Sequence, residues 1–121
     1  MNSSRDSSRA PRLPQSPEQL LEALFTIFPR YRAGYDGPVH DDTPTFHSVL
    51  MSFTPFFGRE AATMPELQLR SLGTLISVAV AAGGSLENAF STCLLEHLHQ
   101  LRASKILRPH LSPLARERIR A

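Results

Sequence analysis

The residue types that could support chemistry gather in one short stretch, between Cys93 and His99. Cys93 and His97 are four positions apart, so a helix would place their side chains on the same face. A thiol beside an imidazole could act as nucleophile and base, or it could supply two ligands to a metal ion. His99 would point away from His97 on a helix, so a zinc site would need a further ligand from elsewhere. The histidines available for this are His40, His47 and His110.

The surroundings of Cys93 favour a structural role over both kinds of chemistry. The thiol lies in the middle of the apolar face of the predicted helix, where burial would hide it from a substrate. We therefore interpret Cys93 as a core residue and His97 as a buried, hydrogen-bonded polar residue. The prediction is a protein that is not an enzyme, with no catalytic residue, no metal and no cofactor. A small enzyme that depends on Cys93 and His97 stays as the second alternative.

Charge is unevenly distributed along the chain, although the formal net charge is only +2. Residues 16–101 carry four basic and nine acidic side chains, whereas residues 102–121 carry six basic and one acidic. Such segregation indicates charge-guided contacts, within the chain or with a partner. From the acidic middle we predict that Asp36, Asp41 and Asp42 help to bind another protein, one with a basic surface.

The basic C-terminal end supports an alternative hypothesis, nucleic-acid binding, with Arg116, Arg118 and Arg120 as the contact residues. These three arginines form one cluster in the sequence with Arg102, Lys105 and Arg108. A helix, a turn and a short basic helix are similar to a helix-turn-helix, but the last helix lacks the amide side chains that read bases. Binding through phosphates alone would weaken steeply with salt. The competing interpretation is a solvated basic end that partly neutralises the acidic middle.

Phe56 is a further candidate contact residue. It lies off the apolar stripe of its predicted helix and next to Pro55, whose missing N–H predicts a kink. A phenylalanine exposed at that point would mark a contact with another protein.

Four amphipathic segments are predicted to position these residues. The first begins with Ser16 as N-cap, Pro17 at the first helical position and Gln19 in a capping box, and it ends or kinks at Pro29. The second begins at Thr43-Pro44, and Gly58 is expected to close it.

The third segment begins at Thr63, with Glu66 completing a capping box, and stops at Gly83-Gly84. Its apolar side chains cover most of the circumference, which predicts a central helix packed on several sides. Small residues follow one another along it at intervals of four and form a groove that another backbone could approach, either within the chain or in a homodimer. These residues are Gly73, Ser77 and Ala81.

The fourth segment is capped by Ser85 and is expected to remain helical to Leu101. On that helix Leu95 would fall among the polar side chains, as an exception to the pattern. The apolar segment with Ile106, Leu107 and Leu111 is then expected to fold back on the core. Ser112-Pro113 begins a short basic helix that runs through Arg120.

Two stretches carry a family resemblance. Residues 86–98 read LENAFSTCLLEHL, and the Phe28-Pro29 helix end is followed later by the FHSVLM run from Phe46. Together they resemble an uncharacterised family of small bacterial all-helical proteins, a domain of unknown function in which some members look like immunity proteins that neutralise a toxin by binding it. The resemblance covers about residues 20–115 and brings no catalytic residue. It implies Asn88, Thr92 and Glu96 as shared polar positions. We expect Asn88 and Glu96 to hydrogen-bond a neighbouring loop, and direct contact with a ligand is the alternative.

Composition is that of an ordinary globular protein, with 41% hydrophobic and 20% charged residues. We predict an all-α fold, a compact bundle of four main helices plus a short C-terminal helix, in a single domain over residues 16–121 behind a disordered tail of residues 1–15. One cysteine excludes an internal disulfide, and no apolar stretch is long enough for a membrane span. The expectation is a cytoplasmic binding module, immunity-like or adaptor-like, that is a monomer or a weak homodimer.

Overall fold

Helices supply all the regular secondary structure in the part of the chain that the computed structural model describes, residues 13–35 and 43–119. The longer helices are α2 (Pro17–Ile27), α4 (Phe46–Glu60), α5 (Glu66–Ala82) and α6 (Gly84–Cys93). The shorter ones are α3 (Pro29–Ala33), α7 (Ser104–Leu107), α8 (Pro113–Arg116) and the 3₁₀ turns η1 (Ala61–Thr63), η2 (Leu95–His97) and η3 (Arg108–His110). The all-α prediction is therefore confirmed, but several short helices stand where one was expected near the C-terminus.

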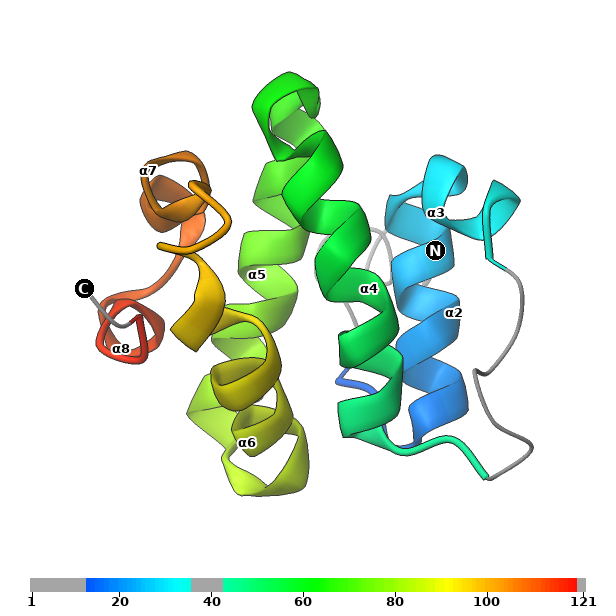
Figure 1. The fold of residues 1–121 in the computed structure, drawn as a ribbon. Coiled ribbons are helices and arrows are strands. Elements are labelled where there is room, and N and C mark those ends of the chain that lie inside the picture. The colour runs from blue at the N-terminus through cyan, green and yellow to red at the C-terminus, as the bar shows by residue number, and fades with distance from the viewer. Residues whose placement is uncertain (1–12, 36–42, 120–121) are drawn as a thin grey trace, which may run out of the picture.

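The helices pack around a shared apolar core. Figure 1 shows α4 in the middle, with α2 and α3 against one side of it and α6 against the other. Helix α5 packs against α2, α6, η3 and α8, which agrees with its predicted central place. One cluster of buried apolar side chains extends from Leu20 on α2 to Ala115 on α8, so the C-terminal segment belongs to the same core as the long helices.

The start of α2 follows from local chemistry. The Ser16 side chain accepts a hydrogen bond from the Gln19 backbone N–H, and Pro17 occupies the first helical position, as predicted. In the predicted capping box, the Gln19 side chain would accept a hydrogen bond from the Ser16 backbone N–H. It accepts one from the Gln15 backbone N–H instead. Leu13, in the segment predicted to be a disordered tail, packs against the core. Residues 1–12 lie outside the described part of the chain.

Helix α4 is longer than the sequence pattern suggested. Thr45 caps it in a reciprocal box with Ser48, two residues after the predicted start at Thr43. Pro55 lies inside the helix, and the predicted stop at Gly58 is wrong because α4 continues to Glu60. A Cβ atom at Gly58 would lie 2.9 Å from Leu101 Cδ2, so this glycine makes room for a side chain from another segment.

Helix α5 begins later than predicted, and α6 ends earlier. Pro65 is the N-cap of α5, so the expected Thr63–Glu66 capping box does not form. Gly83 (φ 75°) ends α5 as predicted, but α6 begins at the next residue without a side-chain cap, so Ser85 is not its N-cap.

The end of α6 at Cys93 corrects the longest predicted helix. A straight helix to Leu101 would leave Leu95 on the polar side, whereas the break at Leu94 lets Leu94, Leu95 and Leu98 all become fully buried. Burying a leucine stabilises a fold by about 1.5–3 kcal/mol, more than a few helical residues contribute through intrinsic propensity. Tertiary packing therefore decides where this helix ends.

A Schellman motif closes the turn that follows η2. The Ala103 N–H donates to the Leu98 carbonyl over 2.9 Å, and the Arg102 N–H donates to the His99 carbonyl over 3.0 Å. Arg102 has φ 59° and is the one residue other than glycine in the left-handed region within the described chain. The motif reverses the chain and directs α7 back toward the core, where Ala103 and Leu107 are fully buried.

The C-terminal segment then crosses the small-residue groove of α5. A Cβ atom added to Gly73 would lie 2.3 Å from the His110 carbonyl oxygen, so only glycine permits this approach. One turn later, the Ser77 hydroxyl accepts a hydrogen bond from the Ser112 backbone N–H over 2.9 Å. The predicted close approach of a backbone is confirmed here, and the backbone is the chain's own, so Gly73 and Ser77 are not free to form a homodimer interface.

The Gly73 contact predicts a strong effect of adding one methyl group. Gly73→Ala should lower the free energy of unfolding by about 1–3 kcal/mol, because the His110 backbone must move away. Gly34→Ala is the matched control, since its Cβ would lie 3.7 Å from the Arg30 carbonyl oxygen, an ordinary contact distance. Urea unfolding of both variants tests this, and equal midpoints would contradict the close approach.

An aromatic cluster holds α2, α3 and α4 together. The Tyr31 ring lies 5.3 Å from the rings of both Phe53 and Phe56, and its hydroxyl is 2.8 Å from the Ser52 hydroxyl. Burial raises the pKa of Tyr31 above its ordinary value of 10.0, and the nearby Tyr35 adds to the rise, while the hydrogen bond with Ser52 opposes it.

This raised pKa predicts a pH-dependent loss of stability. The folded state holds the Tyr31 proton more tightly than the unfolded chain, so its contribution is complete below pH 10.0 and is lost as the pH rises through the folded-state pKa. Tyr31→Phe should therefore flatten the fall in unfolding free energy above that pH. Urea unfolding of both proteins between about pH 9 and 11 measures the slope. Identical slopes would show that Tyr31 does not contribute to it.

Candidate functional site

The acidic residues predicted to bind a partner lie outside the described part of the chain. This holds for Asp36, Asp41 and Asp42, and for Arg120 at the other end. Their predicted roles remain predictions.

Phe56 is buried, which corrects its predicted role as an exposed contact. Its exposed fraction is 8%, and its ring lies 5.9 Å from that of Phe28 and 5.3 Å from that of Tyr31. Helix α4 is covered on two sides, so Phe56, off the main stripe, meets α2 and α3 instead of solvent. The edge of Phe56 helps to line a hollow of about 320 Å³, and the Arg30–Glu60 ion pair (3.1 Å) lies at the same place.

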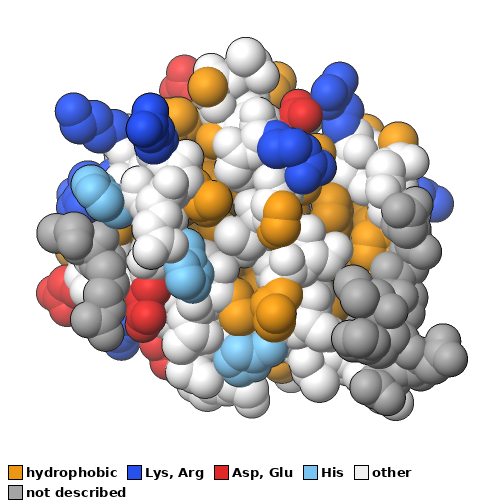
Figure 2. Space-filling model, in the orientation of Figure 1, with side chains coloured by type: hydrophobic (Ala, Val, Ile, Leu, Met, Phe, Trp, Pro, Cys, Tyr) orange, Lys and Arg blue, Asp and Glu red, His pale blue; other side chains and the backbone are white. Residues whose placement is uncertain are grey.

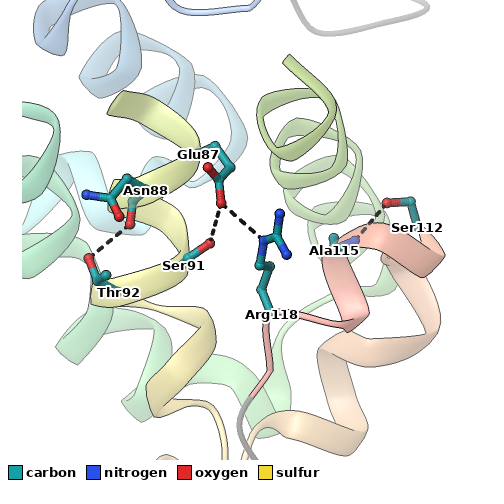
Figure 3. Close-up of polar contacts among 7 residues, drawn as sticks. All are labelled: Glu87, Asn88, Ser91, Thr92, Ser112, Ala115 and Arg118. Carbon is teal, nitrogen blue, oxygen red and sulfur yellow. Dashed lines mark hydrogen bonds and ion pairs between the residues drawn. The ribbon is translucent and has the colours of Figure 1, made fainter. Parts of the chain in front are cut away.

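Arg118 is used within the chain. Its Nε donates to Glu87 Oε2 over 3.1 Å, and the Ser91 hydroxyl donates to the same oxygen over 3.1 Å. Figure 3 shows the Arg118 side chain reaching from the end of the C-terminal segment to these two α6 residues. Both charged side chains are partly shielded, with exposed fractions of 37% and 22%. This contact fastens the C-terminal segment to α6 and removes Arg118 from the candidate contact residues.

Arg116 also contacts its own chain. Its Nε lies 3.2 Å from the Arg108 carbonyl oxygen and 3.1 Å from that of Leu111, which are carbonyls of the preceding turn. Ser112 caps α8 by accepting from the Ala115 backbone N–H, as its position before Pro113 predicted (Figure 3). The helix ends at Arg116, short of the predicted end at Arg120. Because α6 already ends at Cys93 and α8 has four residues, the two helices whose order was similar to a helix-turn-helix do not form that motif.

The predicted polar stripe of the fourth helix is divided by the helix break. The Thr92 hydroxyl donates to the Asn88 carbonyl over 2.9 Å (Figure 3), and Asn88 Nδ2 lies 3.5 Å from His47 Nε2 on α4. Asn88 therefore faces a neighbouring helix and not a loop. Glu96 lies on η2, beyond the break, so it no longer continues the stripe.

His97 is exposed, which corrects its predicted burial. Its Nδ1 lies 3.0 Å from Gln100 Oε1, and the helix ends between it and Cys93, so the four-residue helical spacing does not apply to this pair. The thiol of the half-buried Cys93 donates to the His47 backbone carbonyl oxygen over 3.8 Å, a contact that does not involve the imidazole. Within the described residues, no group of three Cys, His, Asp or Glu side chains is arranged to hold a metal ion.

A group of cations with no counter-ion among the described residues lies on the two segments that the Gly58–Leu101 contact joins. We call it the basic end, and its members are exposed. They are Arg59, Arg102, Lys105 and Arg108. No ion pair or hydrogen bond joins these four side chains to another described residue, whereas each of the other cations in the described part has a partner. Those partnered cations are Arg30, Arg32, Arg70, Arg116 and Arg118.

An exposed ridge of α4 leads to the basic end. Its residues follow a regular helical spacing along the side left open by the neighbouring helices, and they are Ser48, Met51, Pro55 and Arg59. Met51 is 66% exposed, and the half-buried Leu101 lies against Gly58 beside Arg102. We call the ridge, Leu101 and the basic end together the α4–α7 face. Figure 2 shows apolar side chains over α4 and Lys and Arg side chains gathered over α7.

Sequence reasoning grouped Arg102, Lys105 and Arg108 with the C-terminal arginines but did not connect them to Arg59 or Met51. The exposed spacing along the second predicted helix was a usable signal for Met51. Nothing in the sequence shows that Gly58, next to Arg59, packs against Leu101, next to Arg102, because this contact joins distant segments.

A scan against protein-family models and searches of curated proteins and of solved structures found no match for this chain. None of the helices in the described segments has both the length and the apolar character that crossing a membrane requires.

The Glu87–Arg118 contact should contribute more to stability than the exposed Glu66–Arg70 pair, whose side chains are 72% and 62% exposed. A double-mutant cycle with Glu87→Gln and Arg118→Gln should give a coupling energy of about 0.5–1 kcal/mol, and the matched cycle on the exposed pair about 0.3–0.5 kcal/mol. Urea unfolding at low and high salt measures both. A larger coupling for Glu66–Arg70 would contradict the proposed fastening of the C-terminal segment.

Proposed function

We propose that this protein is a non-catalytic binding module that associates with another protein through the α4–α7 face. The observation that carries the proposal is the exposed Met51 on the same α4 ridge as Pro55 and Arg59, with Leu101 against Gly58 at the end of that ridge where the basic end begins. Protein interfaces combine an apolar centre with a polar rim, and methionine and arginine are enriched in them. An isolated exposed apolar residue needs no explanation, but here the apolar and cationic groups adjoin on one surface.

An immunity-like or adaptor-like role fits this proposal, because such proteins act by occupying a partner's surface. The structure changes the expected charge of the partner's surface from basic to acidic. The sequence suggested a basic partner from Asp36, Asp41 and Asp42, which lie outside the described residues. The described surface presents unpaired cations instead, and these favour a partner with an acidic surface.

Nucleic-acid binding is the second candidate, favoured by the same cations. In that case the basic end would contact phosphates, since helices of four residues are too short to fill the major groove. A gel shift with DNA and RNA at about 50 mM salt tests this, because phosphate contacts are strongest at low salt. Absence of any shift would exclude the second candidate.

The proposed function predicts that Met51 is needed for binding but not for folding. Proteins captured by the full chain from native lysate are identified by mass spectrometry, and the most enriched one is purified and titrated. Met51→Ser should weaken its binding about tenfold, because a buried apolar contact is lost.

Leu67→Ser is the matched control, because Leu67 is a comparably exposed apolar residue (70%) on a different helix, α5, and is not part of the α4–α7 face as defined. Both variants should unfold at the same urea midpoint as the parent protein. Equal binding by the parent protein and Met51→Ser would reject the α4–α7 face as the binding surface.

A further inference from the structure

We propose that the α4–α7 face receives an acidic segment of the protein partner, and that Arg102 is the central cation of the site. This inference rests on the proposed function and names the chemistry of the partner. Its three supports are the pairing of cations elsewhere on the surface, the backbone conformation of Arg102, and the apolar groups beside the basic end.

The first support is the contrast between paired and unpaired cations. Arg30 is paired with Glu60, Arg70 with Glu66 and Arg118 with Glu87. The four cations of the basic end have no such partner among the described residues. A carboxylate-rich ligand would supply the counter-ions that these cations lack on the described surface. The surface is therefore complementary to negative charge.

The second support is the strained conformation of Arg102. It occupies the C′ position of a Schellman motif with φ 59°, where glycine is the residue of lowest strain because a Cβ atom crowds the backbone. No hydrogen bond or ion pair joins the arginine side chain to another described residue and offsets this strain. Strain kept at an exposed position points to a role for the side chain in binding.

The third support distinguishes a protein segment from a nucleic acid. Met51 and Leu101 lie beside the cations, so a ligand that covers the α4–α7 face must offer apolar groups as well as negative charge. An amphipathic acidic segment meets both requirements, with carboxylates toward Arg102 and Lys105 and apolar side chains toward Met51. A phosphate backbone would meet only the first requirement.

The experiment measures binding of fluorescent probes to the full chain by anisotropy. The main probe is a synthetic amphipathic peptide of about 15 residues with glutamates on one face and leucines on the other, long enough to form a helix. A peptide with lysine in place of each glutamate and a short DNA duplex are the comparison probes. The acidic peptide should bind most tightly, and its affinity should fall with salt.

Arg102→Gly separates binding from folding, because it relieves backbone strain and removes the cation. It should raise the midpoint of thermal unfolding by a few degrees and weaken acidic-peptide binding about fivefold. Arg102→Lys, which keeps the charge, should bind more tightly than Arg102→Gly, and Arg70→Gln on α5 should bind like the parent protein. Arg59→Gln and Lys105→Gln should each weaken binding without the gain in stability.

Acidic-peptide binding by Arg102→Gly that equals that of the parent protein would overturn the inference, and so would tighter binding of the DNA duplex. If Met51→Ser loses the captured partner while Arg102→Gly keeps it, the proposed function stands and the acidic-segment inference fails. If Met51→Ser keeps the partner, the proposed function itself fails.

Discussion

The backbone contact between Gly73 and His110 is the constraint on which the arrangement of this protein depends. Because α5 has no side chain at that point, the C-terminal segment can lie directly on the helix and bury Leu107, Leu111 and Ala115. The same crossing brings Ser112 to Ser77. The C-terminal segment is thereby part of the core, and its position determines which cations end up beside α4.

Burial outweighs helix propensity at the end of α6. The break at Leu94 gives up helical hydrogen bonds in order to bury three leucines. It also turns His97 outward, away from the place where a continuous helix would have set it near Cys93. The turn that follows leaves Arg102 in a left-handed conformation on the surface. The packing of the core thus has direct consequences for the chemistry that the surface presents.

The distribution of ion pairs determines which part of the described surface carries unpaired positive charge. A formal net charge of +2 conceals the difference between paired cations over much of the described surface and the unpaired basic end. Arg118, which looked like a contact residue in the sequence, fastens the fold instead. Arg59, which drew no attention in the sequence, joins the α4 ridge to the basic end. A charged residue's role here follows from its neighbours in space and not from its neighbours in the chain.

The amino-acid sequence by itself determined the all-α class, the caps at Ser16 and Ser112, and the stop at Gly83. These features depend on interactions within about four residues, which a linear pattern contains. Only the tertiary structure decided that α6 ends at Cys93, that Phe56 is buried, that Glu87 holds Arg118 and that Gly58 packs against Leu101. Each of these depends on contacts between distant segments, because burial and charge pairing are set by which surfaces meet.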